Sequence, residues 1–278
     1  MKYLKKELKN NGYINIIQTK DYIFAEGDLP ICLLAHCDTV FNHLPSEWIY
    51  DKRKEVLWSP SGAGFDDRVG ILIILNLINM GFKPTIIFTT GEEVGGIGAF
   101  RLIADFPEYP FQTKPKFLLQ LDRRGKSDCV FYDCNNKKFI KKIEHYGFKT
   151  AEGLFTDISI IAPIWEIAAV NLSVGYYDEH TKAERVYLKE TRGTLRKVAN
   201  ILTDIDELPC YKYIPIKKNN FFNNLQKNKC HWCGLEVDDI DTTWYQGHID
   251  IDPTWYQQGD IFDFPVPLCP HCAKIAKI

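Results

Sequence analysis

The chain of 278 residues lacks the sequence features of membrane-spanning, secreted and nucleic-acid-binding proteins. It has no unbroken apolar run of about 20 residues, the length that a helix needs to span a bilayer. Its charged start, residues 1–9, has no apolar core of a secretion signal, so we expect a cytoplasmic protein. A net charge of −2 gives no electrostatic attraction to nucleic acid or to a membrane surface, so neither partner is expected.

Hydrophobic residues make up 45% of the chain, which is enough for a substantial core. Apolar segments with the length of strands alternate with segments that have the pattern of helices, and this alternation predicts an α/β fold. On a prior of ~150 residues per domain, the chain has room for roughly two domains. The strand-like segments are 31–35, 85–90, 116–121 and 171–174, and the helix-like segments are 71–80, 137–146, 156–161 and 188–208.

Two adjacent carboxylates, Glu92 and Glu93, follow the strand-like segment 85–90 and precede a glycine-rich turn. Successive side chains leave a strand end in different directions, so one carboxylate could bind a metal ion while its neighbour acts as a base. The alternative is a solvated pair at a helix start, where acidic residues suit the helix dipole. Polar residues at the other strand ends favour the metal site.

Four further candidate ligands lie where a predicted strand or helix meets a loop: His36, Asp66, Asp122 and His180. Imidazole and carboxylate groups are usual ligands of zinc. Asp38 follows the first histidine by two residues, so on an extended chain it points to the same side and can orient the imidazole. Ligand sites of open α/β sheets lie at the carboxyl ends of the strands, so we expect these groups to converge on one crevice.

The number of donors bears on how many metal ions this set can hold. Two histidines and three carboxylates can serve two ions only if one carboxylate is shared between them. Asp66 is the candidate for this bridge. The alternative is that Asp66 is an ordinary helix cap, since Asp is common at helix starts.

In their order along the chain, these motifs resemble the five motifs of the co-catalytic zinc exopeptidases. This superfamily contains peptidase T, aminoacylase, carboxypeptidase G and the tetrahedral glutamyl and leucyl aminopeptidases. The resemblance, over about residues 25–205, implies a mixed central sheet flanked by helices and hydrolysis of a peptide or N-acyl amide bond. The enzyme would be an exopeptidase (aminopeptidase, carboxypeptidase or dipeptidase) or an aminoacylase. The matching segments are 36–40, 66–70, 92–95, Asp122 and His180.

The resemblance also implies which residues hold the metal ions. One zinc ion would be held by His36, Asp66 and Asp122. The other would be held by Asp66, Glu93 and His180. Cobalt or manganese could take the place of zinc at both positions. The shared carboxylate would then be the only donor common to both ions.

The same resemblance assigns catalytic roles. Glu92 would be the general base that takes a proton from the attacking water and returns it to the leaving amine. Asp38 would orient the first histidine. Asp66 is preferred over Asp67 as the bridge because the family places this ligand two residues before a basic residue, here Arg68.

One departure from the family pattern concerns the segment 123–179, between the last two motifs. Many relatives insert a lid or dimerisation domain there, but this segment has only enough residues for ordinary strands and helices, so we expect no lid. The oxyanion of the reaction must then be stabilised by the metal or by a local donor. The candidate donors are Arg123, Arg124, Tyr176 and Tyr177.

Substrate class remains open between several alternatives. Arg123 and Arg124 would suit a free carboxylate on the substrate, because an arginine binds a carboxylate through two parallel hydrogen bonds. Structural pairing of these arginines with Asp67 or Asp157 is an equal alternative. An aminopeptidase would need an acidic site for the substrate amine, which Asp157 or Glu152 could provide. The expected substrate is a small peptide or an N-acyl amino acid.

Four of the nine cysteines form two Cys-x-x-Cys motifs near the end of the chain. In a cytosolic protein this pattern predicts a structural zinc ion bound by four thiolates. A histidine, His231 or His271, could replace one thiolate, and a redox pair is the alternative. The five scattered cysteines are interpreted as small buried hydrophobic residues. The predicted ligands are Cys230, Cys233, Cys269 and Cys272.

Composition changes along the chain predict three parts. Residues 1–208 are expected to form the catalytic domain, 209–229 a linker rich in Lys and Asn, and 230–278 a zinc-ribbon-like module. Within the module, residues 234–268 carry eight Asp or Glu and no Lys or Arg. This segment would repel phosphate groups, which argues against a nucleic-acid-binding protein.

The module contains a short repeat centred on Trp244 and Trp255. The segments 243–246 and 254–257 could pair as strands of a hairpin. They could instead pack on the catalytic domain or form one wall of its crevice. A third alternative is an exposed protein-binding patch, since Trp and Tyr dominate interface hot spots.

Alternative functions share parts of the same pattern. A deacylase acting on a non-peptide substrate could use the same metal pair, because fold and metal do not specify the acyl group. A catalytically inactive binding scaffold with a zinc module is a further alternative. The complete ligand set together with Glu92 argues against the scaffold, since a scaffold needs no general base.

Overall fold

The computed structural model describes residues 1–153, 155–216, 243–248 and 263–268. The chain divides into two units, Met1–Ile216 and Lys217–Ile278, and each is considered by itself. Within the described residues, no helix combines the length and the apolar character that crossing a bilayer requires.

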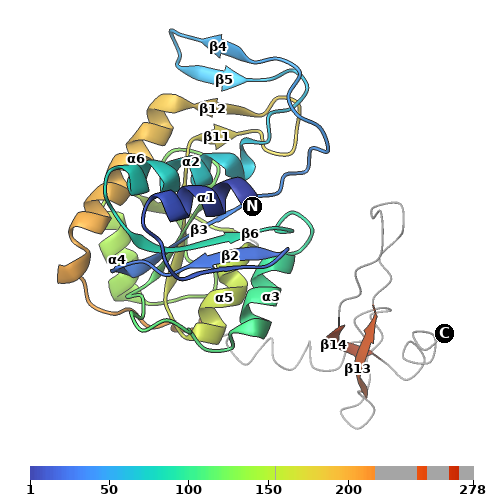
Figure 1. Cartoon of the computed structure of the whole chain (residues 1–278), viewed down its shortest axis with the longest axis vertical. Coiled ribbons are helices and arrows are strands. Elements are labelled where there is room, and N and C mark those ends of the chain that lie inside the picture. Colours follow the sequence, from blue (N-terminus) through green and yellow to red (C-terminus); the bar gives the residue numbers. More distant parts are fainter. Residues whose placement is uncertain (154, 217–242, 249–262, 269–278) are drawn as a thin grey trace. The chain divides into compact units, whose positions relative to one another are not determined.

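An eight-stranded mixed sheet forms the centre of the first unit (Figure 1). Its four middle strands run parallel to one another, and antiparallel pairs occur on both sides of them. The parallel arrangement brings the carboxyl ends of these middle strands to one edge of the sheet. In order across the sheet, the strands are β1 (Ile16–Gln18), β2 (Tyr22–Ala25), β6 (Pro84–Thr89), β3 (Leu29–His36), β7 (Leu118–Arg123), β10 (Ala169–Ser173), β8 (Asp128–Val130) and β9 (Lys149–Thr150).

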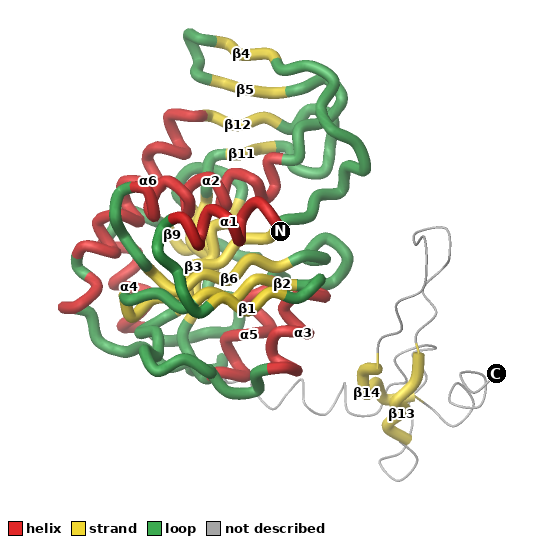
Figure 2. The backbone as a smooth tube through the Cα atoms, viewed as in Figure 1, coloured by secondary structure: helices red, strands yellow, loops and turns green. Residues whose placement is uncertain are grey.

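Helices cover both faces of this sheet (Figure 2). The core on one face contains buried residues of α1, α2, α4 and α6, and the core on the other face contains those of α3 and α5. The arrangement confirms the predicted α/β fold with a mixed central sheet flanked by helices. The helices are α1 (Lys2–Asn10), α2 (Phe65–Asn79), α3 (Ile97–Asp105), α4 (Lys137–His145), α5 (Asp157–Trp165), α6 (Leu188–Thr203) and the short 3-10 helix η1 (Ile205–Glu207).

Strand β3 shows why the apolar run before His36 has no polar alternation. Ile31, Leu33 and Ala35 point into the core with α2, while Cys32 and Leu34 point into the core with α3 and α5. Both faces of the strand are buried, so the positions before His36 are apolar. This apolar strand runs through the core, and His36 lies at its carboxyl end, at the edge of the sheet.

A second, smaller sheet was not predicted. It is antiparallel, and its edge hairpin, β4 and β5, comes from the segment between the first two motifs. Its strands have only two or three residues each and mixed polarity, so they leave little periodic signal in the sequence. The strand order is β11 (Tyr176–Tyr177), β12 (Arg185–Tyr187), β5 (Val56–Trp58) and β4 (Ile49–Asp51).

The segment 123–179 contributes β8, α4, β9, α5 and β10 to the first unit.

Two helix boundaries differ from the sequence expectation. The helix expected over 71–80 begins earlier, at Phe65, and the helix expected over 188–208 ends at Thr203 and is followed by η1.

In the second unit, β13 (Thr243–His248) pairs antiparallel with β14 (Asp263–Leu268). In this register Thr243 lies opposite Leu268 and His248 opposite Asp263. The segment 254–257 lies outside the described residues, so its pairing with 243–246 stays a prediction. Trp255 and the four cysteines Cys230, Cys233, Cys269 and Cys272 lie outside the described residues. The structural zinc site therefore stays a prediction.

The packing of α2 against β7 leads to a prediction for Gly70. A methyl group at this position would collide with the backbone oxygen of Leu121 and with the carboxylate of Asp67. We expect Gly70→Ala to lower the free energy of unfolding by about 1–3 kcal/mol, as overpacking does. Gly193→Ala, in α6, is the matched control, because nothing lies within 4 Å of the added atom, and there we expect a gain of about 0.5–1 kcal/mol. Urea denaturation of both variants tests this, and equal stabilities would contradict it.

Candidate metal centre

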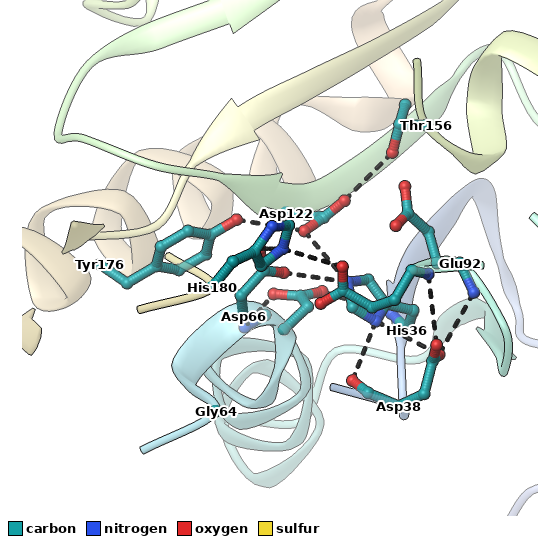
Figure 3. A network of polar contacts seen from close by, with 12 residues as sticks. His36, Asp38, Gly64, Asp66, Glu92, Asp122, Thr156, Tyr176 and His180 are labelled. Carbon is teal, nitrogen blue, oxygen red and sulfur yellow. Dashed lines mark hydrogen bonds and ion pairs between the residues drawn. The ribbon is translucent and has the colours of Figure 1, made fainter. Parts of the chain in front are cut away.

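The predicted site residues converge at the carboxyl edge of the main sheet (Figure 3). His36 ends β3, and Asp122 lies near the end of the adjacent parallel strand β7. Glu93 follows β6, the parallel neighbour of β3 on its other side. Asp66 lies in the first turn of α2, and His180 follows β11. Strand topology thus brings together residues that are far apart in the sequence.

Asp66 lies between the two histidines. Its Oδ1 is 2.9 Å from Nε2 of His36, and its Oδ2 is 3.3 Å from Nε2 of His180. Each oxygen of one carboxylate therefore faces a different imidazole. This arrangement suits a carboxylate whose two oxygens each bind a different metal ion.

Each histidine also faces a second carboxylate. Nε2 of His36 is 3.5 Å from Oδ1 of Asp122, and Nε2 of His180 is 2.8 Å from Oε2 of Glu93. Donor atoms of His36, Asp66 and Glu93 all lie within 4.8 Å of one another. Each histidine therefore lies close to Asp66 and to one further carboxylate.

The donor set fits divalent cations. Oε1 of Glu93 is buried and has no hydrogen-bond partner among the described residues, so it is free to bind an ion. Imidazole nitrogens and carboxylate oxygens are ligands that zinc, cobalt and manganese accept. Three carboxylates facing two imidazoles also leave negative charge that a cation would balance.

Asp38 lies next to the imidazole of His36. Nδ1 of His36 is 3.1 Å from the carbonyl oxygen of Asp38 and 3.4 Å from its carboxylate, so Nε2 is left facing the candidate ligands. The Asp38 carboxylate also accepts the backbone N–H groups of Glu92 and Glu93, each at 3.3 Å. Asp38 therefore ties the end of β3 to the turn after β6.

Three side chains donate hydrogen bonds to Asp122. Gln120 Nε2 and the Thr156 hydroxyl reach Oδ2 at 2.9 and 3.1 Å, and the Tyr176 hydroxyl reaches Oδ1 at 3.2 Å. Tyr176 was predicted as a substrate-binding residue, but its buried hydroxyl holds a candidate ligand. Sequence analysis missed Gln120, although its position two residues before Asp122 places both side chains on the same face of β7.

The two adjacent aspartates of α2 have separate roles. The carboxylate of Asp67 accepts the backbone N–H groups of His36, at 3.3 Å, and of Gly70, at 2.9 Å. Asp66 instead points its carboxylate between the two imidazoles. Of the two, only Asp66 places its carboxylate beside both imidazoles.

Glu184 is a further residue that sequence analysis missed. Its carboxylate accepts the backbone N–H groups of Gly64, at 2.5 Å, and of Asp66, at 3.0 Å. The side chain is completely buried. No local pattern marks it, because its partners lie in a distant part of the sequence.

A crevice of about 550 Å³ opens beside the site. Arg123 lies on its wall, donates to the backbone oxygen of Glu152 at 3.0 Å, and is 4.0 Å from Asp128. Arg124 pairs with Glu179 at 3.0 Å. The lining residues include Asp66, Glu92, Glu93, Asp122, Arg123, Arg124, Glu152, Tyr176, Glu179 and His180.

Three sequence expectations for this crevice are corrected. The arginines pair with neither Asp67 nor Asp157: Arg123 donates to the Glu152 backbone and lies near Asp128, and Arg124 pairs with Glu179. Asp157 is completely buried, accepts the hydroxyl of Thr89 and does not line the crevice, so a substrate amine cannot reach it. The hydroxyl of Tyr177 donates to Glu190 and is not available to an oxyanion.

The clustered charges shift the pKa values of the site in the cation-free arrangement. Burial, and then the charge of Asp122, raise the pKa of Glu92 to about 9. Hydrogen bonds to Asp66 and Glu93 raise the pKa of His180 to about 10. Burial alone would raise the pKa of Asp66, but hydrogen bonds from both histidines lower it below its ordinary value. In the cation-free arrangement, the protonated imidazoles of His36 and His180 provide the positive charge beside Asp66.

No protein-family model and no curated protein sequence matches this chain. Several solved structures are similar in fold. A tripeptidase from Staphylococcus aureus has a TM-score of 0.61 at 14% identity, and the match covers 75% of this chain and 92% of that one. The aminopeptidase PepT from Bacillus cereus has a TM-score of 0.58 at 15% identity, with 74% and 92% covered. A TET aminopeptidase from a marine sediment archaeon, Thaumarchaeota, has a TM-score of 0.52 at 13% identity, with 72% and 89% covered.

The burial of Asp157 leads to a prediction about stability and pH. Burial raises the pKa of this carboxyl to about 6, above an ordinary value of about 3.9 in the unfolded chain. Its contribution to stability is present below about pH 4 and is lost as the pH rises through about 6. Asp157→Asn cannot ionise and keeps an oxygen for the Thr89 hydroxyl. At about pH 8 we therefore expect the variant to be more stable than wild type by on the order of 1–3 kcal/mol.

Urea denaturation of metal-free protein at about pH 4 and about pH 8 measures this difference. The surface variant Asp206→Asn is the control, and it should show no such gain. A stability difference between Asp157→Asn and wild type that does not change with pH would contradict the assigned cause.

Proposed function

We propose that the chain is a hydrolase with two zinc ions that cleaves a peptide or N-acyl amide bond, most simply as an exopeptidase. The observation that carries this proposal is the position of Asp66, whose two oxygens each face a different histidine. Glu92 lines the crevice beside them. The fold is shared with proteins described as a tripeptidase and as aminopeptidases, which favours a peptide substrate.

The residues that would hold the first ion are His36, Asp66 and Asp122. Those that would hold the second are Asp66, Glu93 and His180. When bound, such ions polarise a carbonyl group and make water a nucleophile near neutral pH. Zinc is the expected metal, and cobalt or manganese would suit the same donors.

Glu92 is the proposed general base. It would accept a proton from the attacking water and deliver it to the leaving nitrogen, so that the amine departs uncharged. Its pKa of about 9 in the cation-free arrangement is too high for a base at neutral pH. Nearby cations favour the charged form of a carboxylate, so metal binding would lower this pKa into the working range.

The crevice offers groups for both ends of a small substrate. Arg124 is half exposed on its wall and could pair with a free carboxylate, while Glu179 holds the guanidinium in place. Glu152 lies exposed on the same wall and could bind a substrate amine. A dipeptide or a tripeptide would engage both groups, and an N-acyl amino acid would engage only the arginine.

Metal content gives the first test. Wild-type protein is expected to hold about three zinc ions per chain, two at Asp66 and one at the predicted cysteine site. Asp66→Ala should hold about one, because it removes the donor common to both proposed ions. Elemental analysis of purified protein measures this, with the surface variant Asp206→Ala as the matched control. Equal zinc contents in wild type and Asp66→Ala would refute the shared-ligand assignment.

The general base gives a second test. Glu92→Gln should retain the zinc content of wild type, because the side chain is not among the proposed ligands. It should lose about 10²–10⁴-fold in kcat on a peptide substrate, since an amide cannot accept the proton. Glu108→Gln, on the surface, is the control and should be as active as wild type. Undiminished turnover by Glu92→Gln would remove Glu92 from the mechanism.

A further inference from the structure

Glu184 is a completely buried carboxylate that does not line the crevice. It lies directly before β12 and reaches the start of α2, a part of the chain more than a hundred residues earlier. Oε2 accepts the backbone N–H of Gly64 and Oε1 accepts that of Asp66. Both oxygens therefore hold the one turn that carries the proposed shared ligand.

The start of α2 needs such a partner. The first N–H groups of a helix have no acceptor within the helix, and the positive end of the helix dipole favours an anion there. Gly64, in the N-cap position, has no side chain and takes a left-handed conformation with φ of 62°. The residues Asp66 and Asp67 of this start are not helical, and the regular helix after them is capped by Asp67, which accepts the N–H of Gly70. Glu184, in the segment before β12, satisfies the N–H groups of the irregular start itself.

The conformation of Asp66 makes the contact with Glu184 important for the site. Asp66 has φ of −77° and ψ of 107°, which is not helical, so the regular hydrogen bonds of α2 do not set its direction. The hydrogen bond from its N–H to Glu184 fixes the backbone from which its carboxylate extends. A small rotation of that backbone would move one oxygen away from its histidine.

His180 and Glu184 belong to the same short segment. One turn of this segment is closed by the Thr181 hydroxyl, which donates to the backbone oxygen of Asp178 at 2.7 Å. At one end, His180 faces Oδ2 of Asp66, and at the other, Glu184 holds the Asp66 backbone. The segment therefore sets the position of a proposed ligand and of the shared ligand together.

We propose that Glu184 is a positioning residue of the metal centre. By holding the backbone of Asp66, it keeps each of the two Asp66 oxygens directed at a different metal position. The proposal rests on the proposed function. Glu184 contacts no proposed ligand side chain and acts through the backbone of Asp66. Because that ligand is shared, loss of Glu184 weakens the binding of both ions.

The test measures zinc affinity by chelator competition on the full chain, for wild type, Glu184→Gln and Glu184→Asp. Glu184→Gln places an NH₂ group against one of the two N–H donors, and we expect about 10–100-fold weaker binding of both active-site ions. Glu184→Asp keeps the charge but draws the carboxylate back by one methylene, so we expect a smaller loss. Circular dichroism at the same temperature shows whether each variant is folded.

The matched control is Asp51→Asn. The Asp51 carboxylate also accepts two backbone N–H groups, of Arg53 and Lys54, but at an exposed turn of the small sheet. Its zinc affinity should equal that of wild type. If Glu184→Gln does not fold, the zinc affinity of Glu184→Asp tests the proposal instead, and a weaker affinity than wild type supports it.

Two results would overturn the proposal. One is wild-type zinc affinity in folded Glu184→Gln and Glu184→Asp, and the other is loss of only one of the two ions. If wild type itself binds no pair of ions, the proposed function fails as well. If wild type binds the pair and hydrolyses peptides while the Glu184 variants bind zinc equally well, only the role of Glu184 is rejected.

Discussion

The concentration of carboxylates at one edge of the main sheet is the constraint on which the site depends. Asp66, Asp122, Glu92 and Glu93 all line one crevice, and Asp66 and Asp122 are buried. Carboxylates placed this close together repel one another and lose hydration, so their ionised forms need positive charge nearby. In the cation-free arrangement the two imidazoles face three of these groups. A pair of divalent cations would balance the charge more completely, which is why a metal-dependent hydrolase is the function that we propose.

The elements around this cluster orient its members. Asp38 links the end of β3 to the turn after β6. Donors from β7, from the N-cap of α5 and from β11 hold Asp122. Glu184 reaches from the segment before β12 to the start of α2. Each hydrogen bond limits the directions that a candidate ligand can take, and outer groups of this kind commonly tune metal affinity. The small antiparallel sheet, which was not predicted, contributes to this orientation, because its strands β11 and β12 flank the segment with His180 and Glu184.

Features that lie within one strand or helix were predicted correctly from the sequence. The apolar runs ending at His36 and near Asp122 were recognised because both faces of β3 and β7 are buried. The same reasoning failed where a side chain chooses among distant partners. Arg124 pairs with Glu179 rather than with Asp67 or Asp157, and Tyr176 donates to Asp122. Such pairings depend on which loops meet at the sheet edge, and residue type alone does not reveal this.

The sequence by itself determined the α/β class and the order of the candidate ligands, while the preference for Asp66 over Asp67 came from the family resemblance. Periodicity and the spacing of neighbouring residues are local properties, so they can be recognised without knowing the fold. Only the tertiary structure decided that the two oxygens of Asp66 face different histidines, that Asp157 is completely buried, and that Glu184 accepts the backbone N–H of Asp66. These outcomes depend on the parallel register of β6, β3 and β7 and on contacts between residues as much as 120 positions apart, which no local pattern records.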